Sequence, residues 1–542
     1  MSYPHSGDNT VHNPPSYPHN GDNSVDNLGI TSGQVHNRTS PICHKVKPMV
    51  SIANQPQPNS NTHIRTPCMF VFRRQAPQAS PFATRMSTVD DMSKETQPAA
   101  DATVVPSVNR RILALAVPTF GQLIAEPAFI LIDTAIVGHI GDAALAGLSV
   151  GSTIILTTVG LCVFLAYGTT SQVARLIGAG RRREGLEAGI DGLWLAFIIG
   201  MVVSGAIFAA AEPLCAAMGA RSDVLVNAVA YLRAIVFGLP GMLLVYAANG
   251  IFRGLQKVRI TLVAAAGGAV LNTVLDLLFV FGLGWGIAGS GAATLIAQWF
   301  MGVFLLIPAL AWARADGASW RPRLGGILHT AGDGAPLFVR TLALRTSMVG
   351  TVVLATHMGT QVLAGYQAVN SSWNFVINML DAIAIAGQTL VATELGAGHR
   401  AQARAMTDAT GRAGLIGGTV IGIALATVGV FAAPLFSPTA AVQHLIVVGM
   451  IVLAVFLPLG GWMWALDGIL IGAGDYRYLA VGCTATTAVY LPALVGVNAL
   501  DGWLITSDTA RTVVLWAVIN VLFVGGRALF NGLRIRADRW MR

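Results

Sequence analysis

The segment HIGDAALAG at residues 139–147 returns as HMGTQVLAG at residues 357–365, at an offset of 218 positions. The same offset aligns VARLIGAGRR (173–182) with VATELGAGHR (391–400). It also pairs single residues in the same order: Pro118 with Pro336, Phe120 with Phe338, Pro240 with Pro458, and Gly254 with Gly472. One offset without gaps over more than one hundred residues indicates an internal duplication, so we expect two halves that share one fold.

The repeated unit is predicted to be a bundle of membrane-spanning helices. Of the 542 residues, 54% are hydrophobic and only 11% are charged, whereas a soluble domain has about 25% charged residues. After Arg110 the chain contains twelve apolar stretches, each long enough to cross roughly 30 Å of hydrocarbon as a helix. Their expected spans are 112–138, 144–174, 187–211, 224–252, 258–282, 287–313, 332–357, 361–395, 402–433, 440–473, 477–498 and 507–533. We therefore expect an all-α integral membrane protein whose twelve transmembrane helices form two pseudo-symmetric six-helix lobes.

The expected boundaries divide the chain into a tail and two lobes. Residues 1–107 hold a tandem repeat that begins with YPHSGDN and are rich in polar residues, so we expect a disordered N-terminal tail. A start of natural translation at Met86 or Met92, inside this tail, stays open as an alternative. We expect the N-lobe to cover 108–315 and the C-lobe, with a short basic end, to cover 316–542.

Basic residues predict the orientation of the chain. Arg and Lys occur in every second gap between the predicted helices, as in GAGRRREG (178–185), and before the first and after the last helix. The other gaps lack Arg and Lys apart from Arg221 and Arg511. The positive-inside rule therefore places both termini in the cytoplasm. The low use of Lys beside abundant Ala, Gly and Arg favours a bacterial source, so we expect a multi-pass protein of the bacterial cytoplasmic (inner) membrane. The net charge of +8 gathers in these gaps, which argues against a nucleic-acid partner.

Asp133 is the most informative residue of the first predicted helix. It lies within the apolar run FILIDTAIVGHIG (129–141), where a carboxylate costs a few kcal/mol and is functional by default. Gln122 and Glu126 lie within about 40° of Asp133 on the same helical face. Such a face is a candidate polar relay, with Gln122 and Glu126 as candidate accessory members. For Glu126, a hydrogen bond without a part in the relay stays open as the alternative.

Polar residues elsewhere are candidates for the same relay. Asn272 and Asp276 are four residues apart and share a face of the helix at 258–282, and Thr294 lies in the next helix. Pro118 and Pro127 interrupt the first helix, and each proline removes a backbone hydrogen bond, so we expect the helix to bend at these positions.

The chain resembles the MATE (multidrug and toxic compound extrusion) transporters over roughly residues 108–535. The resemblance rests on the early proline of the first helix, the GAG loops after the second and eighth helices, and three motifs: DTAIVGHIG (133–141), NGIFRG (249–254) and DGILIGAGD (467–475). LDAIAIAGQ (380–388) and ALDGILIGAGD (465–475) are most similar to the DinF-like branch.

The resemblance implies an exporter driven by an ion gradient, with no other cofactor. In the DinF-like branch the implied ion is the proton, and Asp133, Asn272, Asp276 and Thr294 match its proton-relay positions residue by residue. We expect a proton on Asp133 to bend the first helix near Pro118 and to displace a substrate to the outside. The expected substrates are small, cationic, amphiphilic molecules that reach the protein in the lipid bilayer, and the expected transporter is a monomeric, alternating-access antiporter.

The second half lacks the relay residues but has charges of its own. At the 218-residue offset, Thr351 takes the place of Asp133. Intramembrane charges of opposite sign are usually paired, so we expect Arg340 or Arg345 to meet Asp381 or Asp467. Such a pair would stabilise the lobe or contact substrate or ion, and both interpretations stay open. The seventh helix has Arg340 and Arg345 and no acid beyond Asp333 at its start, which argues against sodium coupling.

Other functions are alternatives. A flippase-type exporter of a lipid-linked or amphiphilic metabolite would use the same architecture, and sodium-coupled antiport and a membrane receptor that transports nothing are further readings. Enzymatic activity is not expected, because the chain lacks a GxxxxGK[ST] phosphate loop and an HExxH motif. GLSVG (147–151) lies in an apolar helical run rather than at a strand-to-helix turn, so it predicts no nucleophile. The five cysteines have no metal or redox spacing, so we expect no catalytic residue and no metal site.

Overall fold

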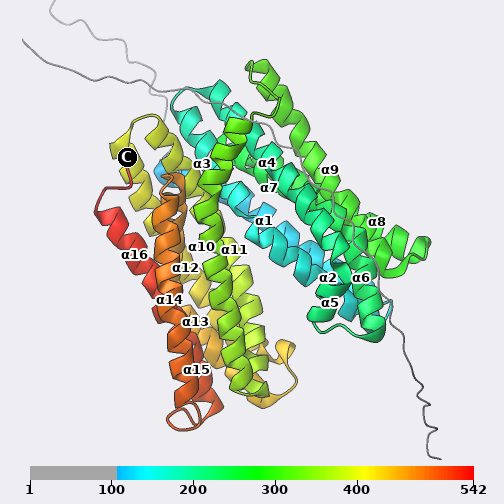
Figure 1. Ribbon diagram of the computed structural model, residues 1–542. Helices are drawn as coiled ribbons and strands as arrows, with labels where there is room; N and C mark the ends of the chain where they lie inside the picture. The colour runs from blue at the N-terminus through cyan, green and yellow to red at the C-terminus, as the bar shows by residue number, and fades with distance from the viewer. Residues whose placement is uncertain (1–106, 542) are drawn as a thin grey trace, which may run out of the picture. The chain divides into compact units, whose positions relative to one another are not determined.

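The computed structural model describes residues 107–541, without the side chains of Glu126 and Phe129. The expected tail and its alternative starts at Met86 and Met92 lie outside the described residues. Helices account for the regular structure of the described part (Figure 1). The first half contains α1 (Val108–Gly138), α2 (Asp142–Leu161), α3 (Phe164–Gly178), α4 (Arg182–Ala209), α5 (Ala211–Ala217), α6 (Ser222–Ile235), η1 (Val236–Gly238), α7 (Leu239–Gly254), α8 (Val258–Asp276), η2 (Leu277–Gly282) and α9 (Gly286–Ala315).

The second half follows a connection at residues 316–323. It contains α10 (Leu324–His357), α11 (Thr360–Gly396), α12 (Arg400–Phe436), α13 (Ala440–Gly472), α14 (Tyr476–Leu500), α15 (Asp508–Val518), η3 (Ile519–Val524) and α16 (Gly525–Arg536). The segments η2 and η3 are π-helical turns that continue α8 and α15.

Twelve helical segments of the described chain are long and apolar enough to cross a membrane. This confirms the expected number of transmembrane helices, and the observed ends lie within several residues of the expected ones. Several spans join shorter helices: α2 and α3 form Asp142–Gly178, and α6, η1 and α7 form Ser222–Gly254. The first span begins at Val108 because the polar lead Val108–Arg111 extends α1 by one turn.

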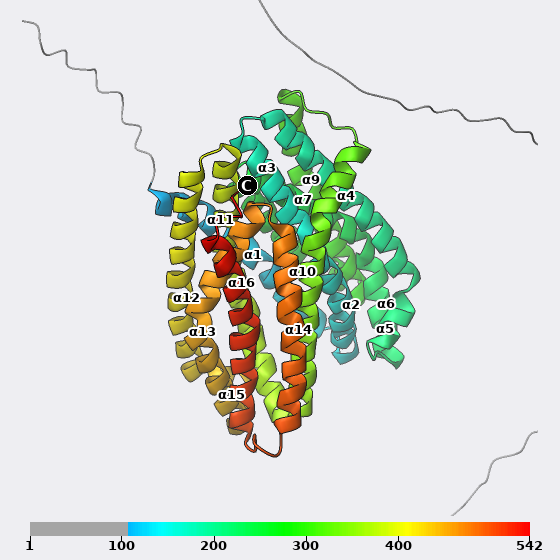
Figure 2. The same ribbon diagram turned by 60° about the vertical axis from the view of Figure 1, so that its left-hand side comes forward.

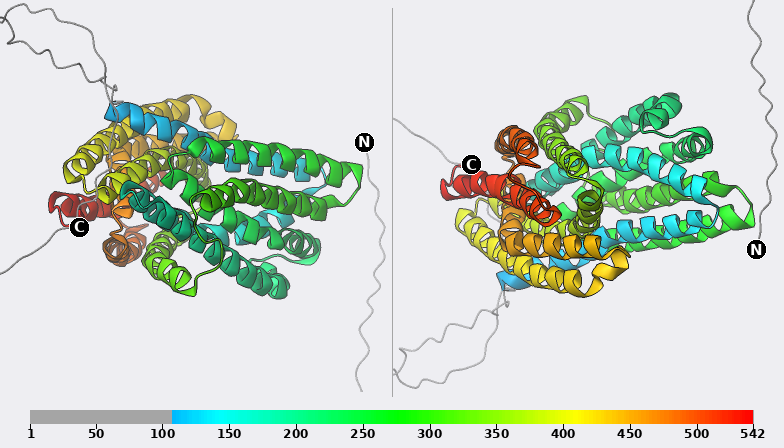
Figure 3. Two further views of the ribbon diagram at one scale, coloured as in Figure 1. Left: turned by 90° about the horizontal axis from the view of Figure 1, so that it is seen from above. Right: turned by 90° about the horizontal axis from the view of Figure 1, so that it is seen from below.

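Each half packs mainly against itself. Within the first half α7 contacts α3, α4 and α9, and within the second half α13 contacts α11, α12 and α16. Seen from above and below, the helices of the second half group together on the left and those of the first half on the right (Figure 3). The halves meet chiefly where α11 packs on α1 and α3, and where α10 packs on α3 and α4 (Figure 2).

Three hydrophobic cores explain where the halves touch. A shared core draws residues from both halves, among them Leu186 and Leu243 from the first and Leu390 from the second. A first-half core consists of residues that lie between Val137 and Ile287 in the sequence. A second-half core consists of residues between Leu354 and Ala528. The two separate cores lie toward the ends that carry α5 and α15, at the lower right and lower left of Figure 1. The halves are therefore joined mainly at the end that carries the basic loops.

Glycines set the closest helix contacts, and they follow the 218-residue offset. A Cβ on Gly250 of α7 would lie 2.7 Å from the Cβ of Thr169 of α3, and a Cβ on Gly468 of α13 would lie 2.2 Å from the carbonyl oxygen of Ala384 of α11. Both spacings leave no room for a side chain. The two glycine-bearing motifs quoted above are therefore matching sites where a helix of each half crosses its neighbour.

Candidate functional site

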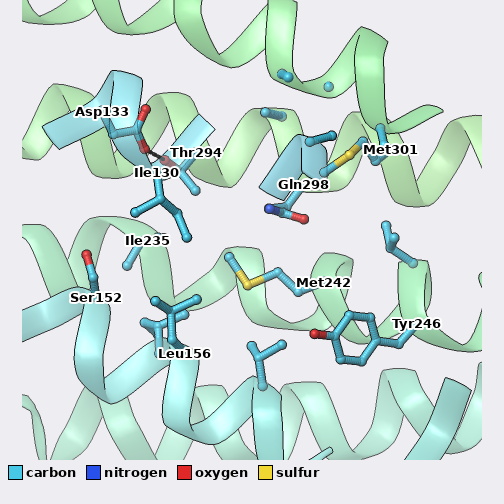
Figure 4. Close-up of a pocket in the computed structure, with 18 of the residues that line it drawn as sticks. Ile130, Asp133, Ser152, Leu156, Ile235, Met242, Tyr246, Thr294, Gln298 and Met301 are labelled. Atoms are coloured by element: carbon cyan, nitrogen blue, oxygen red, sulfur yellow. Dashed lines mark hydrogen bonds between the residues drawn. The ribbon is translucent and has the colours of Figure 1, made fainter. Parts of the chain in front are cut away.

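Asp133, Thr294 and Asn272 form a chain of buried polar groups. The three residues come from α1, α9 and α8, and each is at most 4% exposed. The Thr294 hydroxyl donates to Oδ2 of Asp133 over 3.4 Å, and Nδ2 of Asn272 donates to the Thr294 hydroxyl over 3.2 Å. Figure 4 shows the Asp133 and Thr294 side chains meeting at the edge of a pocket. Residues expected to act together on three helices are thus in contact.

Asp276 completes this group, which we call the acidic cluster (Asp133, Asn272, Asp276 and Thr294). Its side chain is fully buried, and its carboxyl is close enough to that of Asp133 for the two to interact directly. Both oxygens of Asp276 and Oδ1 of Asp133 lack a donor among the described residues. A proton on either carboxyl would supply a donor between them. Asp276 is also the last residue of α8 before the π-helical η2, a local distortion that is frequent at functional sites.

Asp133 and Thr294 of the acidic cluster line a cavity of about 110 Å³ within the first half. Its lining comes from α1, α2, α6, α7, α8 and α9, and is mostly apolar. Gln298, Met242, Met301 and Tyr246 surround the open space in Figure 4. Among the described side chains that line the cavity, Asp133 is the one carboxylate. A mostly apolar pocket with few polar groups is typical of sites for small molecules.

Gln122 lines the same cavity but has other partners than Asp133. Its Oε1 accepts from Nη2 of Arg253 over 3.1 Å and from the Thr261 hydroxyl over 3.3 Å. Arg253 is buried, and it was not predicted as a site residue although it lies in the NGIFRG motif. The side chain of Glu126 lies outside the described residues. Gln122 therefore belongs to a second polar group, separate from the acidic cluster.

The two prolines of α1 lie inside one continuous helix. Pro118 and Pro127 interrupt the backbone hydrogen bonding of Val108–Gly138 without ending the helix. The structure describes one conformation of α1, so the bending itself stays a prediction.

In the second half, Asp467 of α13 holds a buried network of charges. Its carboxylate accepts hydrogen bonds from Nη2 of Arg340 over 2.5 Å, from Nδ2 of Asn531 over 2.6 Å, and from Arg527. Arg527 also lies over the ring of Trp464, 5.0 Å from its centroid. Arg527 and Asn531 were not predicted as site residues, although a charged residue inside the apolar run 507–533 is a signal in the sequence.

Arg345 and Asp381 do not join this ion pair. The guanidinium of Arg345 lies against Gly160 of α2, where a Cβ would be 2.5 Å from Nη2. Asp381 of α11 instead accepts a hydrogen bond of 3.4 Å from the Tyr167 hydroxyl of α3. Both residues therefore lie where one half faces the other.

Further polar contacts connect the halves toward the basic loops. Nε2 of Gln388 donates to the Tyr167 carbonyl over 2.8 Å and to the Ser171 hydroxyl over 2.9 Å. Nearer the loops, Arg111 of α1 forms an ion pair of 3.0 Å with Glu394 of α11. These bonds add to the shared core and hold this end closed. In the part of the chain that the structure describes, no three His, Cys, Asp or Glu side chains gather as metal ligands.

Comparison with known proteins identifies a family whose members match this chain. The family model described as MatE matches residues 118–278 and again residues 336–493. Protein DETOXIFICATION 44, chloroplastic, of Arabidopsis thaliana is 28% identical, over 89% of this chain and 92% of its own length. The DNA damage-inducible protein F of Escherichia coli (strain K12) is 24% identical, over 68% of this chain and 81% of its own length.

Solved structures share the fold. The crystal structure of the Vibrio cholerae MATE transporter VcmN in the bent form superimposes with a TM-score of 0.71. The match covers 80% of this chain and 98% of that chain, at 19% sequence identity. The two matches of the family model begin at Pro118 and Pro336, the positions that the internal offset pairs.

Proposed function

This chain belongs to the MATE family of multidrug and toxic-compound efflux transporters, and from this premise we propose that it exports organic cations in exchange for protons. Members of the family are multi-pass membrane transporters, use ion gradients and are not enzymes. In our proposal the four residues of the acidic cluster carry the proton, and the adjoining cavity holds the substrate.

The observation that carries the proposal is the place of Asp133. It is the one carboxylate among the described side chains lining a mostly apolar cavity, and it belongs to a buried hydrogen-bonded chain. A carboxylate in such a cavity can bind either a proton or a cationic group, but not both at once. Competition between the two is the simplest way to exchange them across a membrane.

The second half favours the proton over sodium. Asp467 is its most deeply buried acid, and two arginines and an asparagine already bind it. Hard metal cations need several oxygen ligands and no neighbouring positive charge. We therefore propose that the Asp467 network stabilises the second half and does not bind the coupling ion.

The contacts between the halves support alternating access. We propose that the basic loops face the cytoplasm of a bacterial cell, that both termini lie there, and that the described conformation is therefore closed inward. In this proposal, Pro118 and Pro127 provide the bend of α1 that accompanies protonation of Asp133.

Reconstitution into proteoliposomes tests the proposal. A pH gradient should drive accumulation of a cationic dye such as ethidium, and a sodium gradient of equal size should not. Asp133→Asn removes the titratable group but keeps the size of the side chain, so export should fall to the background of empty vesicles. Asp142→Asn, at the exposed start of α2, is the matched control and should transport normally.

Two results would overturn the proposal. One is undiminished pH-driven export by the Asp133→Asn protein at wild-type levels of insertion. The other is dye transport that follows the sodium gradient and ignores the pH gradient.

A further inference from the structure

Arg345 occupies an unusual depth for an arginine. It lies in α10, 21 residues after Leu324 and 12 residues before His357. At 1.5 Å per residue these separations are about 31 and 18 Å, so Arg345 is far from both helix ends and within the depth of the hydrocarbon. Arginine at this depth costs at least about 2.5 kcal/mol by insertion scales and marks a substrate or ion path by default.

Two other arginines deep within their membrane spans have an acidic partner, whereas Arg345 does not. Arg340 and Arg527 both bind Asp467. Arg345 is exposed, and no described side chain or carbonyl forms an ion pair or a hydrogen bond with it. A charge without a partner in this position must be hydrated or bound to something outside the protein chain.

The guanidinium also reaches across to the first half. It lies against Gly160 of α2, and a Cβ at Gly160 would be 2.5 Å from Nη2 of Arg345. Leu156 lies one helical turn before Gly160 and lines the cavity that contains Asp133. One turn is about 6 Å along α2, so the positive charge lies next to the wall of that cavity.

We propose that Arg345 binds an anionic group of the exported molecule. The inference rests on the proposed export function and refines its substrate class: amphiphiles with a carboxylate or sulfonate beside their cationic group. The cationic group faces Asp133, and the anionic group faces Arg345 across the rim of the cavity. A guanidinium suits this role because it binds a carboxylate through two parallel hydrogen bonds.

A bound lipid headgroup is the other source of such an anion. Lipid phosphates lie in the interfacial region, outside the hydrocarbon core, whereas Arg345 lies about 18 Å along α10 from its nearer end. A phosphate would have to enter the gap between the halves to reach it. The depth therefore favours a transported molecule, and the experiment includes a lipid arm.

A matched pair of dyes tests the inference by binding, without transport. Tetramethylrhodamine carries a cation and a free carboxylate, and its ethyl ester carries the cation alone. Fluorescence polarisation with the purified full chain in a neutral detergent gives the dissociation constant of each dye. We expect the wild type to bind the free acid about tenfold more tightly than the ester.

Variants identify the residue responsible. Arg345→Gln should remove the preference while leaving ester binding unchanged, and Arg345→Lys should keep part of it. Arg233→Gln on α6 is the matched control, because Arg233 is also an exposed arginine on a membrane helix and lies over the ring of Phe208. A thermal melt of each variant reports whether the fold is kept.

The outcomes separate this inference from the export proposal. Equal binding of both dyes by the wild type, or an unchanged preference in Arg345→Gln, overturns the inference even if export is driven by pH. A preference lost on adding phosphatidylglycerol but not phosphatidylcholine assigns the guanidinium to a lipid headgroup and also overturns it. A preference that depends on Arg345 supports the inference even if the export test fails.

Discussion

Thr294 connects two side chains that belong to different helices. It accepts a hydrogen bond from Asn272 and donates one to Asp133. Thr294→Val keeps the shape but removes the hydroxyl, so Asp133 loses its donor and proton-driven export should slow about tenfold. Thr294→Ser restores the hydroxyl and should restore most of the rate. Dye uptake under a pH gradient measures the export rate of each variant. Equal rates for Thr294→Val and Thr294→Ser would contradict the role of the hydroxyl.

Asp467 is predicted to matter for stability rather than for transport. Asp467→Asn leaves Arg340 and Arg527 buried without a counter-ion, and such a loss costs about 3–5 kcal/mol. The unfolding temperature of the purified variant should fall sharply. Asp475→Asn is the control, because the ion pair of Asp475 with Arg534 is partly exposed and contributes about 0–1 kcal/mol. Similar melting of the two variants would show that the buried network is not stabilising.

The sequence indicated the members of the acidic cluster but not all of their surroundings. Asp133 and Asp276 were identifiable because a carboxylate in an apolar run is rare. Gln122 was grouped with Asp133 by helical periodicity, but the two are eleven residues apart, about 16 Å along the helix. Periodicity gives the face of a helix and not the partner at a given depth, so the contact of Gln122 with Arg253 was not predictable.

At the scale of helices, the glycine crossings are the most specific feature. Gly468→Ala should destabilise the contact of α13 with α11, because the added Cβ would meet the Ala384 carbonyl at 2.2 Å and force the helices apart. We expect a loss of about 1–3 kcal/mol. Gly496→Ala on α14 is the control, since a Cβ there has no neighbour within 4 Å. Fluorescence-detected size-exclusion chromatography after heating measures the fraction of each variant that stays folded. Equal folded fractions for Gly468→Ala and Gly496→Ala would contradict the packing argument.

The number of helices was predictable, and their irregularities were not. Hydropathy and the 218-residue offset gave twelve spans, because each span is a long apolar run. The break between α2 and α3 and the π-helical turns η2 and η3 lie inside apolar runs. Side chains of similar hydropathy continue through them, so no local signal marks these positions.

For the whole molecule, transport is predicted to require separation of the halves at the end with the basic loops. Gln256, in the turn between α7 and α8, lies 3.4 Å from the hydroxyl of Thr393 on α11, measured from its Nε2. Gln256→Cys with Thr393→Cys, in a background where the five native cysteines are serines, should be joined by a short bis-methanethiosulfonate reagent, which forms a disulfide with each cysteine and releases methanesulfinate. Joining them should stop dye export, and a reductant should restore it.

Each single cysteine variant is the control for this experiment and should export normally after the same treatment. Continued export by the joined protein would show that the halves turn over without separating at this point.

The three hydrophobic cores also imply an order of biogenesis. Every member of the first-half core lies between Val137 and Ile287, so this core is complete before α10 leaves the ribosome. The shared core needs Leu466 of α13 and Ile535 of α16, and so it closes only when synthesis is nearly finished. The interface between the halves is therefore the last surface to be buried in the nascent protein. Stalled or truncated chains should expose this surface to the chaperones and proteases of the membrane, while the first half is already folded.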